Sequence, residues 1–125
     1  MVEQQPHFPG TAAIDAYGNG GFRFAGMSHR GSLLCLPDGI WGWPVTSHAE
    51  LTEDALAPIL ARAGDLDILL IGTGRDLWVM PDPLRQQFRT QQVTADTMPT
   101  GAAVRTYNVL VAERRRVAAA LIAVD

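Results

Sequence analysis

The sequence contains no lysine, and all ten of its basic residues are arginines. A chain without lysine has no side-chain amine for a Schiff base and no lysine for a Walker-type phosphate loop, so both chemistries are excluded. The single cysteine, Cys35, can form no disulfide within the chain and lies in an apolar stretch typical of a buried side chain. These features predict a protein of a reducing, cytoplasmic compartment.

Long apolar runs and strong positive charge are also missing. No apolar run approaches the roughly 20 residues that a membrane helix needs, and the first residues do not resemble a signal peptide. The 125 residues carry a formal net charge of −3, which gives no electrostatic reason to bind nucleic acid. The three histidines are scattered without metal-ligand spacing. We therefore expect no nucleic-acid partner, no metal, no cofactor and no integral membrane segment.

The order of the patterned segments predicts an α/β domain. Residues 1–10 are polar, contain two prolines and predict a flexible N-terminus, and residues 11–125 then form one domain. Strands come first, and helices and strands alternate after them, which predicts a mixed sheet flanked by helices. Strands are expected over 13–17, 22–24, 32–36, 68–71, 93–95 and 117–124, with a short extended piece over 77–79. Helices are expected over 52–63, 84–90 and 102–113. If the last strand lies at an open edge, it offers a surface for a weak homodimer; otherwise the chain is a monomer.

The most informative segment is the apolar run from Ile68 to Ile71, which is followed by Gly72, Thr73 and Gly74. A continuous apolar run predicts a strand covered on both faces, and the glycines after it allow a ligand or another backbone to approach. The segment lacks the third glycine of a dinucleotide fingerprint, so a classical nucleotide site is not favoured. A simpler anion site remains open, with these candidate residues: Gly72, Thr73, Gly74, Arg75, Thr100, Arg105, Thr106, Tyr107 and Asn108.

A purely structural interpretation of the same residues is also open. The glycine turn would then pack against the helix entered at Thr100, which would cap that helix. Tyr107 would lie in the core with its hydroxyl satisfied, and Asn108 would bind backbone. The sequence has no Gly-x-Ser-x-Gly elbow, and its one adjacent carboxylate pair is explained by a helix start, so we identify no catalytic residue and favour a protein that is not an enzyme.

Tryptophan is the residue type with which the chain could hold a protein partner. Trp41, Trp43 and Trp78 are candidate anchors, because tryptophan is enriched where interfaces concentrate their binding energy. Each of them could equally belong to the core. The exposure of the three rings separates the two interpretations.

Six short blocks, spread over almost the whole chain, resemble one family: Ile-Asp-Ala-Tyr at 14–17, Gly-Ser-Leu-Leu at 31–34, Leu-Thr-Glu-Asp at 51–54, Ile-Gly-Thr-Gly at 71–74, Thr-Tyr-Asn-Val-Leu at 106–110 and Arg-Val-Ala-Ala-Ala-Leu at 116–121. In this order they resemble the adipogenesis-associated Mth-type domain family, a domain of unknown function. Its mitochondrial branch is the third assembly factor of respiratory complex I. The resemblance implies a three-layer α/β domain, with a mixed sheet of about five strands and a small extra β-layer.

The same resemblance implies a function. A bacterial, non-enzymatic interaction protein is expected, similar to an assembly factor for complex I or for membrane proteins. Its protein clients would be respiratory or membrane-insertion subunits. The alternative is a protein that binds a small anionic metabolite, or an uncharacterised enzyme, that uses the crevice at Gly72–Gly74.

Overall fold

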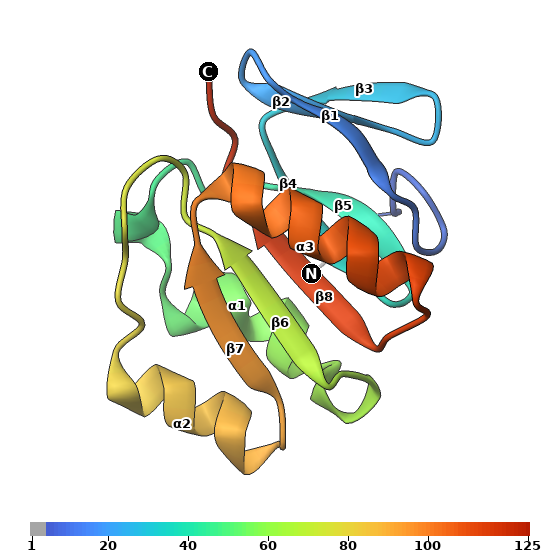
Figure 1. Cartoon of the computed structure of the whole chain (residues 1–125). Coiled ribbons are helices and arrows are strands. Elements are labelled where there is room, and N and C mark those ends of the chain that lie inside the picture. The colour runs from blue at the N-terminus through green and yellow to red at the C-terminus, as the bar shows by residue number, and fades with distance from the viewer. Residues whose placement is uncertain (1–4) are drawn as a thin grey trace.

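Strand pairing divides the chain into two β-sheets (Figure 1). We describe residues 5–125 from a computed structural model. The first sheet is antiparallel and has the order β1-β2-β3, formed by β1 (Ile14–Gly18), β2 (Gly21–Phe24) and β3 (Met27–Arg30). The second is mixed and has the order β5-β4-β8-β6-β7, formed by β4 (Ser32–Leu36), β5 (Gly39–Trp43), β6 (Ile68–Gly72), β7 (Thr94–Met98) and β8 (Val117–Leu121).

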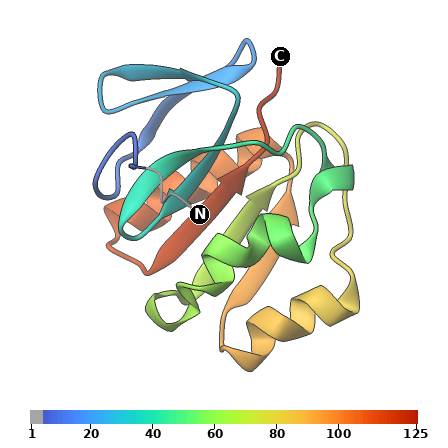
Figure 2. The same ribbon diagram turned by 180° about the vertical axis from the view of Figure 1, so that it is seen from behind.

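Helices cover both faces of the five-stranded sheet, and two apolar clusters fill the spaces between the layers. The helices are α1 (Glu53–Leu60), α2 (Asp82–Thr90) and α3 (Thr100–Ala112), with short 3₁₀ turns η1 (His48–Glu50) and η2 (Ala63–Asp65). One cluster lies under α1 and α2, which are in front of the sheet in Figure 2. The other lies under α3 and the three-stranded sheet, on the opposite face. The predicted fold class, with its extra β-layer, is confirmed.

Strand β8 lies in the middle of the large sheet. It pairs antiparallel with β4 on one side and parallel with β6 on the other, and all five of its residues are buried. Its three consecutive alanines are fully buried, so little side-chain volume separates the sheet from its covering helices. Of the two alternatives left open for this last strand, the open dimerisation edge is therefore excluded, because both of its edges are paired within the sheet.

Two local features differ from the sequence-based expectations. Strand β3 has the polar sequence Met-Ser-His-Arg and was not predicted; its pairing with β2 follows a tight turn in which Ala25 and Gly26 have φ of 50° and 76°. At the N-terminus, Phe8 pairs with Ile40, with the Ile40 N–H donating to the Phe8 carbonyl at 2.9 Å. This part of the terminus that was expected to be flexible is thus attached to β5, and residues 1–4 lie outside the described part.

The turn between β4 and β5 is linked to the end of α1 by an ion pair. Arg62 donates from Nε and Nη2 to the two carboxylate oxygens of Asp38, at 2.7 and 3.1 Å, and lies over the ring of Trp41. These hydrogen bonds lower the pKa of Asp38, so its carboxylate is charged more readily in the folded chain than in the unfolded one.

The lowered pKa of Asp38 predicts a pH-dependent contribution to stability. A group whose pKa is lower in the folded state stabilises the fold above its unfolded pKa, and the contribution is lost as the pH falls through the folded pKa. We expect Asp38→Asn to be less stable than wild type at neutral pH, with the difference beginning to shrink as the pH drops below about 4 and vanishing only below the lowered folded-state pKa. Urea unfolding of both proteins across this range tests it. A difference that does not change with pH would contradict the charge-based explanation.

Candidate functional site

The predicted crevice begins where β6 ends, and there the chain packs closely against the start of α3. A Cβ atom on Gly72 would lie 3.0 Å from the Thr100 Cα and 3.1 Å from a Leu121 methyl group. Glycine at this position therefore lets the first turn of α3 approach the strand. Gly74 then turns the chain with a φ of 86°, a conformation that glycine adopts without the steric penalty of a Cβ.

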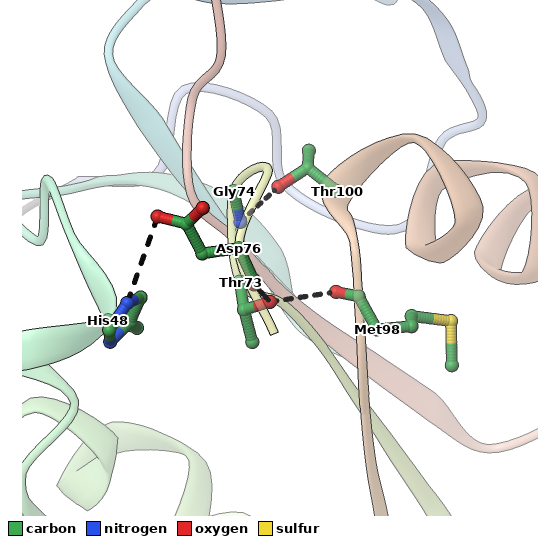
Figure 3. A network of polar contacts seen from close by, with 6 residues as sticks. All are labelled: His48, Thr73, Gly74, Asp76, Met98 and Thr100. Carbon is green, nitrogen blue, oxygen red and sulfur yellow. Dashed lines mark hydrogen bonds and ion pairs between the residues drawn. The ribbon is translucent and has the colours of Figure 1, made fainter. Parts of the chain in front are cut away.

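Thr100 joins three segments of the chain at this point. Its hydroxyl oxygen accepts the Gly74 N–H at 3.0 Å (Figure 3) and donates to the Ile122 carbonyl at 2.7 Å. Its own N–H donates to the Gly74 carbonyl at 2.9 Å, and the residue is fully buried. The loop after β6, the start of α3 and the segment after β8 are thus held together by one side chain, although Thr100 is the first helical residue and not the cap.

The polar groups of Thr73 are also engaged within the chain. Its N–H donates to the Met98 carbonyl at 2.9 Å, and its hydroxyl donates to the Asp76 carbonyl at 2.6 Å and lies 3.3 Å from the Met98 carbonyl oxygen (Figure 3). The anion site was expected to use the backbone N–H groups of residues 72–74 and the Thr73 hydroxyl. The N–H groups of Thr73 and Gly74 and the hydroxyl already donate to protein atoms. This arrangement agrees with the structural interpretation, while a ligand-binding role for these two residues stays a prediction.

Asn108 and Tyr107 point away from the glycine turn. The Asn108 amide accepts the Ile14 N–H at 2.8 Å and donates to the Ile14 carbonyl at 2.9 Å, which fixes β1 against α3. Tyr107 is fully buried; its hydroxyl has no oxygen or nitrogen partner among the described residues and interacts with the Cys35 thiol. The hydroxyl is therefore not satisfied in the way that the structural interpretation expected.

Burial controls the ionisation of this Tyr107–Cys35 pair. It raises the pKa of the Cys35 thiol to about 12, and it raises the pKa of the Tyr107 hydroxyl far above its usual range, with Cys35 adding to the effect. The thiolate is the nucleophilic form of cysteine. Cys35 consequently behaves as a buried apolar side chain, as the sequence predicted.

The structure brings three of the candidate residues to one cavity of about 530 Å³ at the start of α3. Gly74, Arg75 and Arg105 line it, together with Tyr17 and Gly101 and four further residues, namely Pro99, Ala102, Val124 and Asp125. Arg75 donates to the Asp125 carbonyl oxygen at 2.7 Å, and Arg105 is exposed. Thr106, the remaining candidate, is half-buried one residue further along α3 and does not line this cavity.

Sequence reasoning missed Tyr17 as part of this site. The Tyr17 hydroxyl lies so close to Gly101 that a Cβ there would overlap it. The two residues are far apart in the sequence and belong to different layers. No local pattern signals such a contact.

The three tryptophans are less exposed than a partner-binding role would favour. Trp43 is only 7% exposed, and its Nε1 donates to the Ala55 carbonyl at 3.2 Å. Trp41 and Trp78 are half-buried and pack against the cluster under α1 and α2. The residues on either side of Trp78 are the exposed ones instead: Leu77 is 83% and Val79 is 85% exposed. The sequence predicted an extended piece here but not which side chains face solvent.

Two features are absent from the part of the chain that the structure covers. Within residues 5–125, no group of three or more His, Cys, Asp or Glu side chains could hold a metal ion. In the same range, no helix has the length and hydropathy to cross a membrane.

Comparisons with known proteins agree with the fold. The family model "Protein of unknown function (DUF498/DUF598)" matches residues 14–122. An uncharacterised protein of Rhodobacter capsulatus is 41% identical over 98% of this chain and 93% of its own length. The crystal structure of a Bartonella henselae protein, described as an outer membrane protein, has a TM-score of 0.90 at 53% identity and covers 95% of this chain and 100% of that one.

A relative whose name states a role in assembly is less similar in sequence to this chain. The mouse protein "NADH dehydrogenase [ubiquinone] 1 alpha subcomplex assembly factor 3" is 30% identical over 94% of this chain. The match spans 64% of the length of the mouse protein. The role in complex I assembly that this name states is that of the mouse protein.

Proposed function

We propose that this chain, which belongs to the DUF498/DUF598 family of proteins of unknown function, is a non-enzymatic interaction protein. In this proposal it acts in the cytoplasm and holds subunits of respiratory complex I, or of another membrane-protein complex, during assembly. The similarity to the mouse assembly factor supports this class of client. The observation that carries the proposal is a pair of exposed apolar side chains on one short segment.

This segment, residues 77–79, is called the Leu77–Val79 segment. It lies between β6 and α2 in the sequence. In both views of the fold it runs beside β7, on the side away from β6 (Figures 1 and 2). Its residues alternate, because Trp78 packs inward while Leu77 and Val79 are 83% and 85% exposed. The Thr97 hydroxyl donates to the Trp78 carbonyl at 3.0 Å and attaches the segment to β7.

Such a pair is suited to hold a protein client. Contiguous exposed apolar surface is a feature of protein-interaction sites. Burying a Leu or Val side chain fully in a partner contributes about 1.5–3 kcal/mol. The two together are therefore enough to decide whether a moderate-affinity complex forms.

We expect the variant Leu77→Ser/Val79→Ser to lose its clients while keeping its fold, since both side chains contact mainly solvent. The test is affinity capture of tagged protein from cross-linked native cells, read by mass spectrometry. Wild type should enrich complex I or membrane-insertion subunits, and the double variant should enrich them at least about tenfold less. Val109→Ser is the matched control, because Val109 is an apolar residue of α3 that is 56% exposed. The proposal is contradicted if the wild-type protein captures no such subunits.

A second candidate function is the binding of a small anion in the cavity between Arg75 and Arg105. The observation that favours it is that these two arginines line the same 530 Å³ cavity at the start of α3. The variant Arg75→Ala distinguishes the candidates. Loss of anion binding with an intact fold favours the cavity, and an unchanged set of captured clients favours the Leu77–Val79 segment.

A further inference from the structure

The three-stranded sheet has one face buried and one face open. Its inner face carries Ile14, Phe22 and Phe24, which are buried in the cluster that also contains Tyr107 of α3. In Figure 1 the sheet lies above α3, at the end of the molecule away from α2. Because successive side chains of a strand point to opposite faces, the alternate residues of each strand form the outer face.

The register of the strands places six residues together on that outer face. Arg23 of β2 is opposite Ala16 of β1 and Ser28 of β3, and all three are exposed. In the neighbouring row, Gly21 is opposite Gly18 and Arg30. Arg23 and Arg30 are therefore diagonal neighbours, at about 7–8 Å between backbone positions, which is within reach of long side chains.

These residues form a hollow with a basic rim. A cavity of about 450 Å³ is lined by these six residues together with Tyr17, Asn19, Phe22 and His29. Gly21 has to be small here because a Cβ there would overlap the His29 carbonyl oxygen. No carboxylate lines the cavity within residues 5–125. Neither guanidinium forms an ion pair or a hydrogen bond with another residue of that range.

We propose that this outer face of the three-stranded sheet is a binding site for a phosphate group, held by Arg23, Arg30 and the Ser28 hydroxyl. The two guanidinium groups can only donate hydrogen bonds, and the Ser28 hydroxyl can donate one as well, which is the chemistry that an oxyanion requires. One guanidinium can satisfy both oxygens of a carboxylate, whereas a phosphate has further oxygens for the second guanidinium and the hydroxyl. The site is distinct from the cavity between Arg75 and Arg105 and does not depend on the proposed function.

Titration of the ¹⁵N-labelled full chain with inorganic phosphate tests the site. Sodium chloride holds the ionic strength constant, and the amide signals of Gly21, Arg23 and Ser28 are followed. Wild type should show saturable shifts of these signals. Arg23→Ala and Arg30→Ala should each weaken the fitted Kd about tenfold, because a hydrogen bond to a charged group is lost.

Two matched probes make the test decisive. Arg89→Ala removes another exposed arginine, on α2, and should leave the Kd unchanged. Succinate replaces phosphate by carboxylates and should bind more weakly. The proposal is overturned if no shift saturates, if the shifts lie around Arg105 and persist in Arg23→Ala/Arg30→Ala, or if succinate binds as tightly as phosphate. Unchanged dispersion of the β2 and β3 amide signals confirms that the variants are folded.

Discussion

Replacement of Thr100 by valine is expected to lower the free energy of unfolding by about 3 kcal/mol, since it leaves two buried polar groups without a partner. The substitution keeps the shape of the side chain and removes its hydroxyl. The Gly74 N–H then loses its acceptor and the Ile122 carbonyl loses its donor. Because Thr100 is fully buried, water cannot replace either bond without a change in the packing.

Urea unfolding followed by circular dichroism measures this loss. Thr106→Val is the matched control, because Thr106 lies on the same helix and its hydroxyl has no hydrogen bond with another described residue. It should change the free energy of unfolding by less than about 1 kcal/mol. Equal losses for the two variants would mean that the Thr100 hydroxyl does not hold the three segments together.

Gly21→Ala is expected to have an effect of similar size on the small sheet. The added methyl group would overlap the backbone carbonyl oxygen of His29 in β3, and a backbone atom cannot rotate away as a side chain can. Relief requires β2 and β3 to separate locally, so we expect a loss of about 3 kcal/mol, at the upper end of overpacking effects.

Thermal unfolding and amide exchange of β3 measure the effect of Gly21→Ala. The neighbouring Gly20→Ala is the control: Gly20 has a φ of 78° and no other group within 4 Å of its added Cβ. Its cost should be limited to about 1–2 kcal/mol for the left-handed conformation. If Gly21→Ala costs no more than this control, the β2–β3 register described above is incorrect.

Much of the fold follows from local patterns in the sequence. The apolar run of β6 and the glycines after it predicted a strand covered on both faces and a close approach by a ligand or another backbone, and Gly72 against Thr100 shows such an approach. Elements fixed by their pairing partners rather than by their own residue pattern were harder to predict. Strand β3 is polar and depends on β2, and the central position of β8 depends on β4 and β6, which are distant in sequence.

The candidate site was only partly predictable for the same reason. Residue type correctly suggested that Asn108 could bind backbone, and the structure shows its amide on Ile14. Which donors are already used is set by contacts between distant segments, such as the Gly74 N–H bond to Thr100. Exposure is likewise a property of the folded surface. Composition pointed to the tryptophans as anchors, but the side chains most open to solvent are Leu77 and Val79.

The most direct test of the central claim is the quantity of complex I or membrane-insertion subunits captured by wild type relative to Leu77→Ser/Val79→Ser. Both proteins are expressed at equal levels in native cells, cross-linked, purified and measured by quantitative mass spectrometry. If the protein holds its clients through the Leu77–Val79 segment, wild type should enrich these subunits reproducibly. The folded double variant should enrich them at least about tenfold less. Equal capture by the two proteins, or no such subunit captured by wild type, would contradict it.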